Sequence, residues 1–111
     1  MESIPKGLAV LILVNSTPSS ANARRAWQTA LTLHDQGHSI TLFLIQDGVL
    51  AALNGETALR DLPSDISCYV LGEDLALRGF TPLKLHKQVQ VADYAQLVDL
   101  FDQHARVIGA L

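Results

Sequence analysis

The stretch Leu-Ala-Val-Leu-Ile-Leu-Val at residues 8–14 decides the fold class. It is apolar on both faces, which is the pattern of a central parallel strand covered by helices on each side. Turn and cap residues follow at 15–20. From Ala21 the apolar residues recur at helical spacing, up to Gly37, which is placed to end the helix. The sequence therefore opens with a strand, a loop and a helix, as α/β proteins do.

The same alternation continues to the end of the chain. Further strands are expected at 40–45, 66–71, 89–91 and 106–111. Between them we expect a short helix at 49–53, an irregular connector at 56–65, a helix ending at Gly79 and a helix capped by Asp93. Short links and regular alternation predict a three-layer α/β/α domain with a five-stranded, mostly parallel sheet.

Two of the helices carry an apolar stripe that is expected to face the core. In the first helix the stripe consists of Ala23, Ala26, Trp27, Ala30, Leu31 and Leu33. In the helix after Asp93 it consists of Tyr94, Leu97, Val98 and Phe101.

Composition narrows the class of protein. The chain has 111 residues and a net charge of −3, with 49% hydrophobic and 17% charged residues. This length fits a single domain over residues 1–111, and the small acidic excess excludes a nucleic-acid binder that works through bulk positive charge. One cysteine cannot form a disulfide within the chain, and no Cys/His cluster has zinc spacing, so neither a disulfide nor a metal is expected to hold the fold together. No GxGxxG or GxxxxGK(S/T) motif is present, so no cofactor is expected. The lone thiol favours the cytoplasm.

The apolar run at 8–14 is also a candidate targeting segment. It is far shorter than the roughly twenty residues that span a bilayer, so no membrane association is expected. A secretory signal is the alternative, with Ala21-Asn22-Ala23 as a small-residue cleavage site. Because Glu2 cancels the charge of Lys6 before the run, the strand interpretation is preferred.

Ligands of open parallel sheets bind beyond the carboxyl ends of the strands. The first such segment offers hydroxyls and backbone N–H groups at a helix start, which suits an anion, although Ser19 or Ser20 at that position also serves as an ordinary helix cap. Asp47, Glu73 and Asp74 follow the next two strands, and their carboxylates suit general acid/base chemistry or a hard cation. Alternatively, Glu73 and Asp74 are first-turn acids that favour the dipole of the following helix. The candidate ligand- or anion-binding residues are Asn15, Ser16, Thr17, Asp47, Gly48, Gly72, Glu73 and Asp74.

Cys68 is the one candidate sulfur nucleophile, and it lies within the strand at 66–71. A thiol at such a position is either a small buried hydrophobic residue or a catalytic group. The histidines lie at helix ends and in loops, where a surface position is expected; they are His34, His38, His86 and His104.

Three motifs resemble those of the DsrE/DsrF/DsrH superfamily, with the DsrH/TusB branch nearest. Residues 45–52 (IQDGVLAA) are similar to its strand-then-QDGV-x-AA motif, and residues 69–80 (YVLGEDLALRGF) to its Y-x-L-x-x-D-L-x-x-RG segment. Residues 91–100 (VADYAQLVDL) resemble its D-Y-x-x-F/L-V-D-L helix.

This resemblance implies a five-stranded parallel sheet, trimeric or hexameric assemblies of related subunits, and a sulfur relay in which a cysteine carries persulfide sulfur for tRNA thiolation or sulfur oxidation. The position of the active cysteine in the DsrE branch holds Leu71 here, and the first helix has no cysteine near Ala30 to Leu33. Cys68 corresponds to a position that is usually aliphatic in the family.

Three functions therefore stay open. The first is a non-catalytic interaction subunit of a sulfur-relay oligomer, homo- or heteromeric, without direct nucleic-acid contact. The second is a sulfurtransferase that carries persulfide on Cys68. The third is a small-ligand or anion-binding module at the carboxyl ends of the strands.

Overall fold

The computed structural model describes residues 7–53, 59–60, 62–81 and 85–109, and these form a three-layer α/β/α domain. The sheet has five strands in the order β4-β3-β2-β1-β5, and every neighbouring pair is parallel. The strands are β1 (Ala9–Val14), β2 (Ser39–Leu44), β3 (Ser67–Leu71), β4 (Val89–Ala92) and β5 (Arg106–Ile108). The expected fold class is confirmed.

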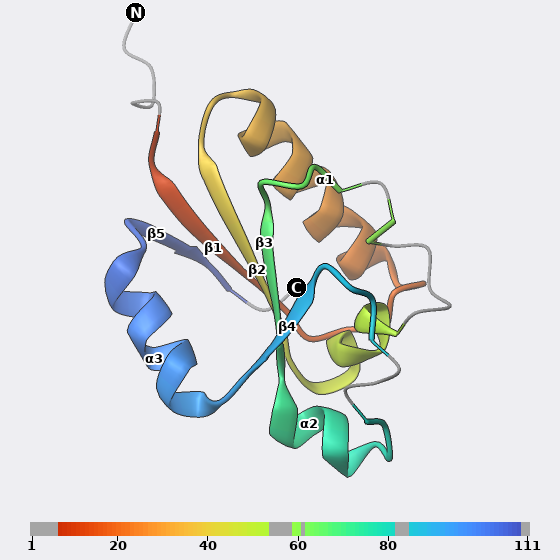
Figure 1. The fold of residues 1–111 in the computed structure, drawn as a ribbon. Helices are drawn as coiled ribbons and strands as arrows, with labels where there is room; N and C mark the ends of the chain where they lie inside the picture. The colour runs from red at the N-terminus through yellow and green to blue at the C-terminus, as the bar shows by residue number, and fades with distance from the viewer. Residues whose placement is uncertain (1–6, 54–58, 61, 82–84, 110–111) are drawn as a thin grey trace, which may run out of the picture.

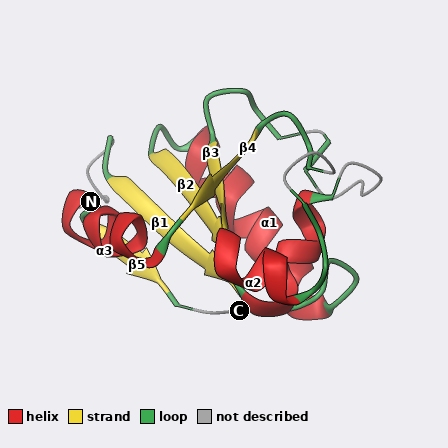
Figure 2. Cartoon of the chain, turned by 60° about the horizontal axis from the view of Figure 1, so that its bottom comes forward, coloured by secondary structure: helices red, strands yellow, loops and turns green. Residues whose placement is uncertain are grey.

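Helices cover both faces of the sheet, as Figures 1 and 2 show. The long helix α1 (Ala21–Asp35) and the 3₁₀ helix η1 (Gln46–Ala52) pack on one face. The other face is covered by α3 (Tyr94–Gln103), a helix of 10 residues. The short helix α2 (Gly72–Leu77) begins directly at the carboxyl end of β3.

The alternation of side chains along each strand produces two cores of unequal size. The larger lies under α1 and η1 and includes every second residue of β1 and β2, namely Val10, Ile12, Val14, Ile40, Leu42 and Leu44. The smaller lies under α3 and consists of Leu11, Phe43, Leu71, Ala92 and Leu97. The rings of Phe43 and Tyr69 stack there, with centroids 6.0 Å apart. One face of the sheet is thus less well covered than the other.

Capping residues fix the helix ends. The Ser20 side chain accepts a hydrogen bond from the backbone N–H of Ala23 at 3.0 Å, so it is the N-cap of α1. Gly37 follows the end of that helix with φ 93°, in the left-handed region that glycine adopts without strain. Asp93 and Gln96 form a reciprocal capping box at the start of α3.

Several local expectations are corrected. The short helix expected at 49–53 is a 3₁₀ helix that starts earlier, at Gln46, where φ is 51°. The last strand ends at Ile108 rather than at residue 111. Residues 110–111 lie outside the described part, as do residues 56–58 and 61 of the connector expected at 56–65. Leu31 is exposed because the core side of α1 is filled by its alanines and Trp27.

The stripe of α3 is the largest correction. Of its four apolar residues only Leu97 is buried, whereas Tyr94, Val98 and Phe101 are exposed. Leu97 and Leu100, which is half-buried, make the contact with the sheet instead. The helix is rotated so that one apolar flank faces the sheet and a second one faces outward.

The surface position expected for the histidines is wrong for His38, which is 5% exposed. The chain turns back at Gly37, and the backbone N–H of His38 bonds to Leu33 O at 3.1 Å, which places this residue under the end of α1. His104 is half-buried between α3 and the sheet. Its Nδ1–H donates to the Leu100 carbonyl at 2.6 Å, and its Nε2 is hydrogen-bonded to the Thr41 hydroxyl at 2.8 Å.

Candidate functional site at the carboxyl ends of the strands

The candidate ligand-binding residues predicted at 15–17, 47–48 and 72–74 lie together at one edge of the sheet in the structure. The loop at 15–20 leaves β1, η1 follows β2, and α2 begins where β3 ends. The backbone N–H of Ile45 donates to the carbonyl of Val14 at 2.9 Å, which holds the start of η1 against the end of β1. The predicted clustering of these segments therefore follows from parallel strands that end at the same edge.

Gly48 is required by the closeness of η1 to β1. A Cβ atom at this position would overlap the carbonyl oxygen of Val14 and lie 2.8 Å from its carbonyl carbon. Since both are backbone atoms, no side-chain rotation relieves the overlap. The glycine of the QDGV sequence thus has a packing role at this edge.

Asp74 joins the end of β2 to α2. Its Oδ2 accepts a hydrogen bond from the backbone N–H of Gln46 at 2.6 Å. Gln46 has φ 51°, so this bond holds a backbone conformation that is uncommon for residues other than glycine. The carboxylate predicted for acid/base or cation chemistry therefore serves the backbone of a neighbouring segment.

Arg78 pairs with the second carboxylate of this edge. Its Nη2 and Nε donate to Asp47 Oδ1 at 3.1 and 3.3 Å, and its Nη1 donates to the carbonyl of Asp74 at 3.2 Å. The Asp47 side chain is more than half exposed, so this pair contributes little to stability. Together Asp47, Asp74 and Arg78 connect the QDGV and D-L-x-x-RG sequences, and the role of Arg78 was not predicted.

The remaining predicted ligand residues have mainly structural surroundings. The Ser20 hydroxyl, which caps α1, donates to Ser16 Oγ at 3.0 Å, and the backbone N–H of Ser20 bonds to Thr17 O. The alternative interpretation, in which Ser20 is an ordinary helix cap, is therefore confirmed. Asn15, at the start of this loop, is half-buried, and Glu73 is exposed. Gly72 packs closely on β4, because a Cβ atom at this position would lie 2.9 Å from Val91 Cγ1. Binding of a small ligand or anion at this edge stays a prediction.

Cys68 lies away from this edge, inside the larger core. Its side chain is 4% exposed and packs with Val70 and the residues under α1. Burial raises the pKa of the Cys68 thiol from 9.0 to about 12, because an apolar environment disfavours the thiolate. The thiolate is the reactive form, so both access and ionisation are unfavourable for sulfur chemistry at this position.

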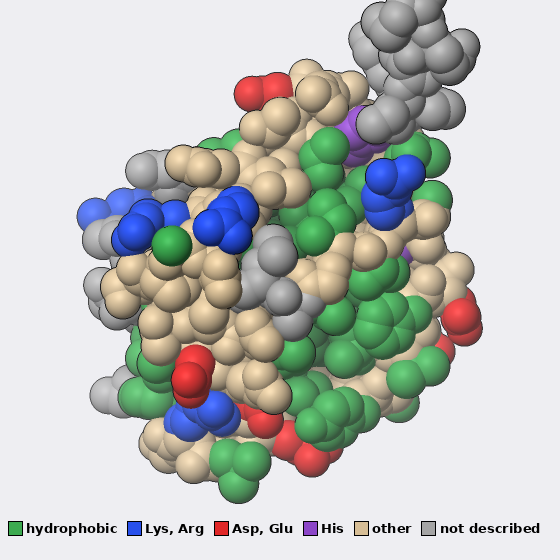
Figure 3. All heavy atoms as spheres, turned by 180° about the vertical axis from the view of Figure 1, so that it is seen from behind, with side chains coloured by type: hydrophobic (Ala, Val, Ile, Leu, Met, Phe, Trp, Pro, Cys, Tyr) green, Lys and Arg blue, Asp and Glu red, His purple; other side chains and the backbone are tan. Residues whose placement is uncertain are grey.

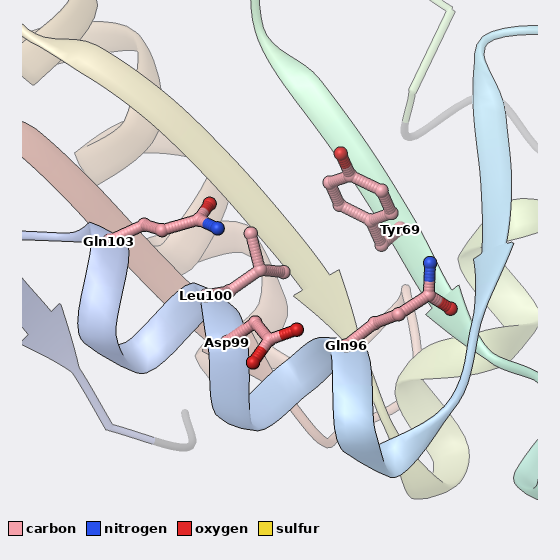
Figure 4. Close-up of a pocket in the computed structure, with 5 residues that line it drawn as sticks. All are labelled: Tyr69, Gln96, Asp99, Leu100 and Gln103. Carbon is pink, nitrogen blue, oxygen red and sulfur yellow. The ribbon is translucent and has the colours of Figure 1, made fainter.

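Surface hollows lined by described residues also lie elsewhere, and two of them are considered in turn. One, of about 200 Å³, is lined by Tyr69 of β3 and by four residues of α3, Gln96, Asp99, Leu100 and Gln103, as Figure 4 shows. The other, of about 330 Å³, is lined by His34, Gly37, His38, Ser39 and Asp65 at the opposite end of β2.

The second hollow brings together two histidines, His34 and His38, which were each expected at the surface. His34 Nε2–H donates to Asp65 Oδ1 at 2.8 Å, although 31 positions separate them in the chain. The Nδ1 atoms of His34 and His38 are buried and have no hydrogen-bond partner among the described residues. Within that part of the chain, no three His, Cys, Asp or Glu side chains are grouped to hold a metal ion.

The hydrogen bonds of the carboxyl edge lead to a first prediction. We expect Asp74→Asn to lower the free energy of unfolding by about 1–2 kcal/mol, since it weakens a charge-assisted bond to a backbone donor. Asp47→Asn, the matched control, should cost less than about 1 kcal/mol because its ion pair is at the surface. Urea unfolding of both variants measures the difference. Equal losses would refute the backbone role of Asp74.

No helix in the described part of the chain is both long and apolar enough to cross a membrane. The fold and the carboxyl edge define a small parallel α/β domain whose sequence motifs meet in one structural cluster. This is the class of the DsrE/DsrF/DsrH superfamily. Residues 19–107 match the family described as DsrH like protein, and the chain belongs to this family.

Individual relatives agree with this placement. The chain is 37% identical over 94 residues to Protein TusB of Pectobacterium parmentieri, covering 84% of this chain and 96% of that protein. It is 44% identical over 64 residues to Protein TusB of Serratia proteamaculans (strain 568), covering 57% of this chain and 66% of that one, just under two thirds. The crystal structure of ychN protein from E. coli has a TM-score of 0.81 at 19% identity, over 95% of this chain and 99% of that chain, and shares the fold.

Proposed function

We propose that this chain is a subunit of a cytoplasmic sulfur relay for tRNA thiolation, which assembles with related subunits and does not itself carry the sulfur. Membership of the DsrH-like family and the similarity to two TusB proteins support the relay. The resemblance of this family to sulfur-transfer proteins supplies the chemistry: a cysteine of another subunit holds the persulfide. The chain contacts neither nucleic acid nor membrane directly.

The buried state of Cys68 is the observation that carries the non-catalytic role. A persulfide carrier must meet a donor thiol and an acceptor, and each transfer needs an accessible thiolate. Cys68 is 4% exposed and its pKa is raised to about 12. It is the second residue of β3 and lies in the core under α1, away from the carboxyl end of the strand where the loops meet. These features favour a packing role for this thiol.

Genetic complementation tests this function. In cells that lack the chain we expect less thiolated tRNA, and both the wild type and Cys68→Ser should restore it to the same level. Restoration by the wild type alone would assign the sulfur to Cys68 and favour the sulfurtransferase alternative. Unchanged tRNA thiolation in the deletion strain would contradict the relay itself.

A further inference from the structure

The hollow of about 330 Å³ lies at the amino end of β2, away from the carboxyl edge. In Figure 1 the turn from α1 to β2 and the start of β3 lie at the same end of the sheet. The hollow is lined by His34 from the last turn of α1, by His38 and Ser39 after the turn at Gly37, and by Asp65 just before β3. None of these residues belongs to the cluster formed by the QDGV and D-L-x-x-RG sequences.

The two imidazoles that line this hollow have unused hydrogen-bonding capacity. His38 is only 5% exposed, and its Nδ1 is buried without a partner among the described residues. The Nδ1 of His34 is buried and unpartnered in the same part of the chain. Because His34 Nε2–H donates to Asp65 Oδ1, Nδ1 of the neutral ring is an acceptor. Buried polar atoms are nearly always paired, so two unpaired ones beside a hollow indicate a site for a bound group.

Charge around the hollow favours a positively charged group. The Asp65 carboxylate lines it, and Asp35 Oδ1 lies 3.9 Å from His34 Nδ1. The carboxyl-terminal end of α1, where the dipole is negative, is at the same place. No lysine or arginine is among the described lining residues, so an anion is disfavoured.

No large field of one sign from the rest of the molecule competes with these local groups. Only 17% of the residues are charged, with a net charge of −3. On the face that Figure 3 shows, Lys, Arg, Asp and Glu side chains are few and most of the surface is hydrophobic or uncharged. The nearby carboxylates and the end of α1 therefore determine which ligand charge is favoured here.

The donor set distinguishes between a metal ion and an organic cation. A bound metal ion needs several protein ligands, and no three His, Cys, Asp or Glu side chains of the described residues are grouped to supply them. A primary ammonium group instead donates three hydrogen bonds, which imidazole nitrogens and a carboxylate accept. A hollow of about 330 Å³ also has room for a short aliphatic chain beside the ammonium group.

We propose that this hollow binds a small primary amine in its ammonium form, held by the Asp65 carboxylate and by the imidazoles of His34 and His38. The ligand supplies the hydrogen bonds that the buried ring nitrogens lack within the described part of the chain. This binding is independent of the sulfur relay, because the hollow lies at the opposite end of β2 from the carboxyl edge.

Titration of the purified chain with 1-aminobutane tests the proposal. At about pH 8 an aliphatic amine is fully protonated. We expect saturable binding in the millimolar range by calorimetry, and the imidazole NMR signals of His34 and His38 should shift with the same saturation curve. Butyrate, which has the same chain length and the opposite charge, should not bind. Equal binding of butyrate, or a titration that does not saturate with the amine, would overturn the proposal.

A pair of matched variants tests where the amine binds. Asp65→Asn should raise the dissociation constant of 1-aminobutane by about 10-fold or more, because it removes the charge from one hydrogen-bond acceptor. The Asp65 side chain is 75% exposed, so the fold is retained, which circular dichroism verifies. Asp102→Asn makes the same change of charge at an exposed position on α3, on the other face of the sheet, and should leave the constant unchanged.

Equal weakening by the two variants would mean that the amine responds only to net charge and would refute the site. Zn²⁺ added alone that binds at His34 and His38 more tightly than the amine would also refute it, since the hollow would then be a metal site. Complementation of tRNA thiolation measures the relay function separately, so failure of one proposal is distinguishable from failure of the other.

Discussion

Gly48→Ala is expected to lower the free energy of unfolding by about 3 kcal/mol or more, a large share of the total for a domain of this size. A Cβ atom at this position overlaps the backbone carbonyl of Val14, so either β1 or η1 must move. Movement of η1 would also disturb Val49, Ala51 and Ala52, which are buried under the same face of the sheet. The cost therefore includes both the overlap and lost packing.

Urea unfolding of purified protein measures this loss. Gly109→Ala is the matched control, because a Cβ atom there meets no atom of the described residues within 4 Å and the backbone does not have positive φ. We expect this control to stay within about 0.5 kcal/mol of the wild type. A Gly48→Ala protein as stable as the control would mean that η1 does not lie against β1 as the structure describes.

The second large effect concerns the reactivity of Cys68 with a thiol reagent. Near neutral pH we expect the folded protein to react about 1000-fold more slowly than the unfolded chain, or slower still. The pKa of the thiol rises from 9.0 to about 12 on burial, and each unit removes tenfold of the thiolate. The low exposure of the side chain slows the reaction further. Raising the pH towards 12 increases the native rate without a plateau, because the thiol stays largely protonated below that value.

A cysteine on the exposed side of the same strand provides the control. Ser67 is exposed next to Cys68, so Ser67→Cys in a Cys68→Ala background should react at nearly the rate of an unfolded chain. Rates are measured in native buffer and in urea for both proteins. If native Cys68 reacts as fast as this control thiol, Cys68 is not buried in the folded protein.

The fold was predictable because its strands are covered on both sides. Continuous apolar runs such as residues 8–14 have few other interpretations in a chain of this length, and the turn signals at Gly37 and Asp93 set the helix ends. Periodicity also picked out Tyr94, Val98 and Phe101 of α3 but assigned them to the core, whereas all three are exposed. Apolar residues at helical spacing show which sides of a helix are apolar, but they do not show which of those sides packs on the sheet.

The site was less predictable because its contacts cross long distances in sequence. The positions of Asp47 and Asp74 were correctly placed at neighbouring strand ends, but the partners of their carboxylates depend on where Gln46 and Arg78 lie in space. Likewise, nothing local indicates that His38 is buried, since this depends on the turn back under α1 after Gly37. Sequence position alone therefore could not show that the carboxylates of Asp47 and Asp74 already have hydrogen-bond partners.

The central claim is that this chain supports a sulfur relay without carrying the sulfur. The most direct measurement is the mass of the intact, folded chain after incubation with a persulfide donor. We predict that the wild type gains no sulfur atom, whereas the Ser67→Cys, Cys68→Ala control gains one on its exposed thiol. A sulfur atom added to the wild type, and absent from Cys68→Ser, would contradict the account and make Cys68 a persulfide carrier.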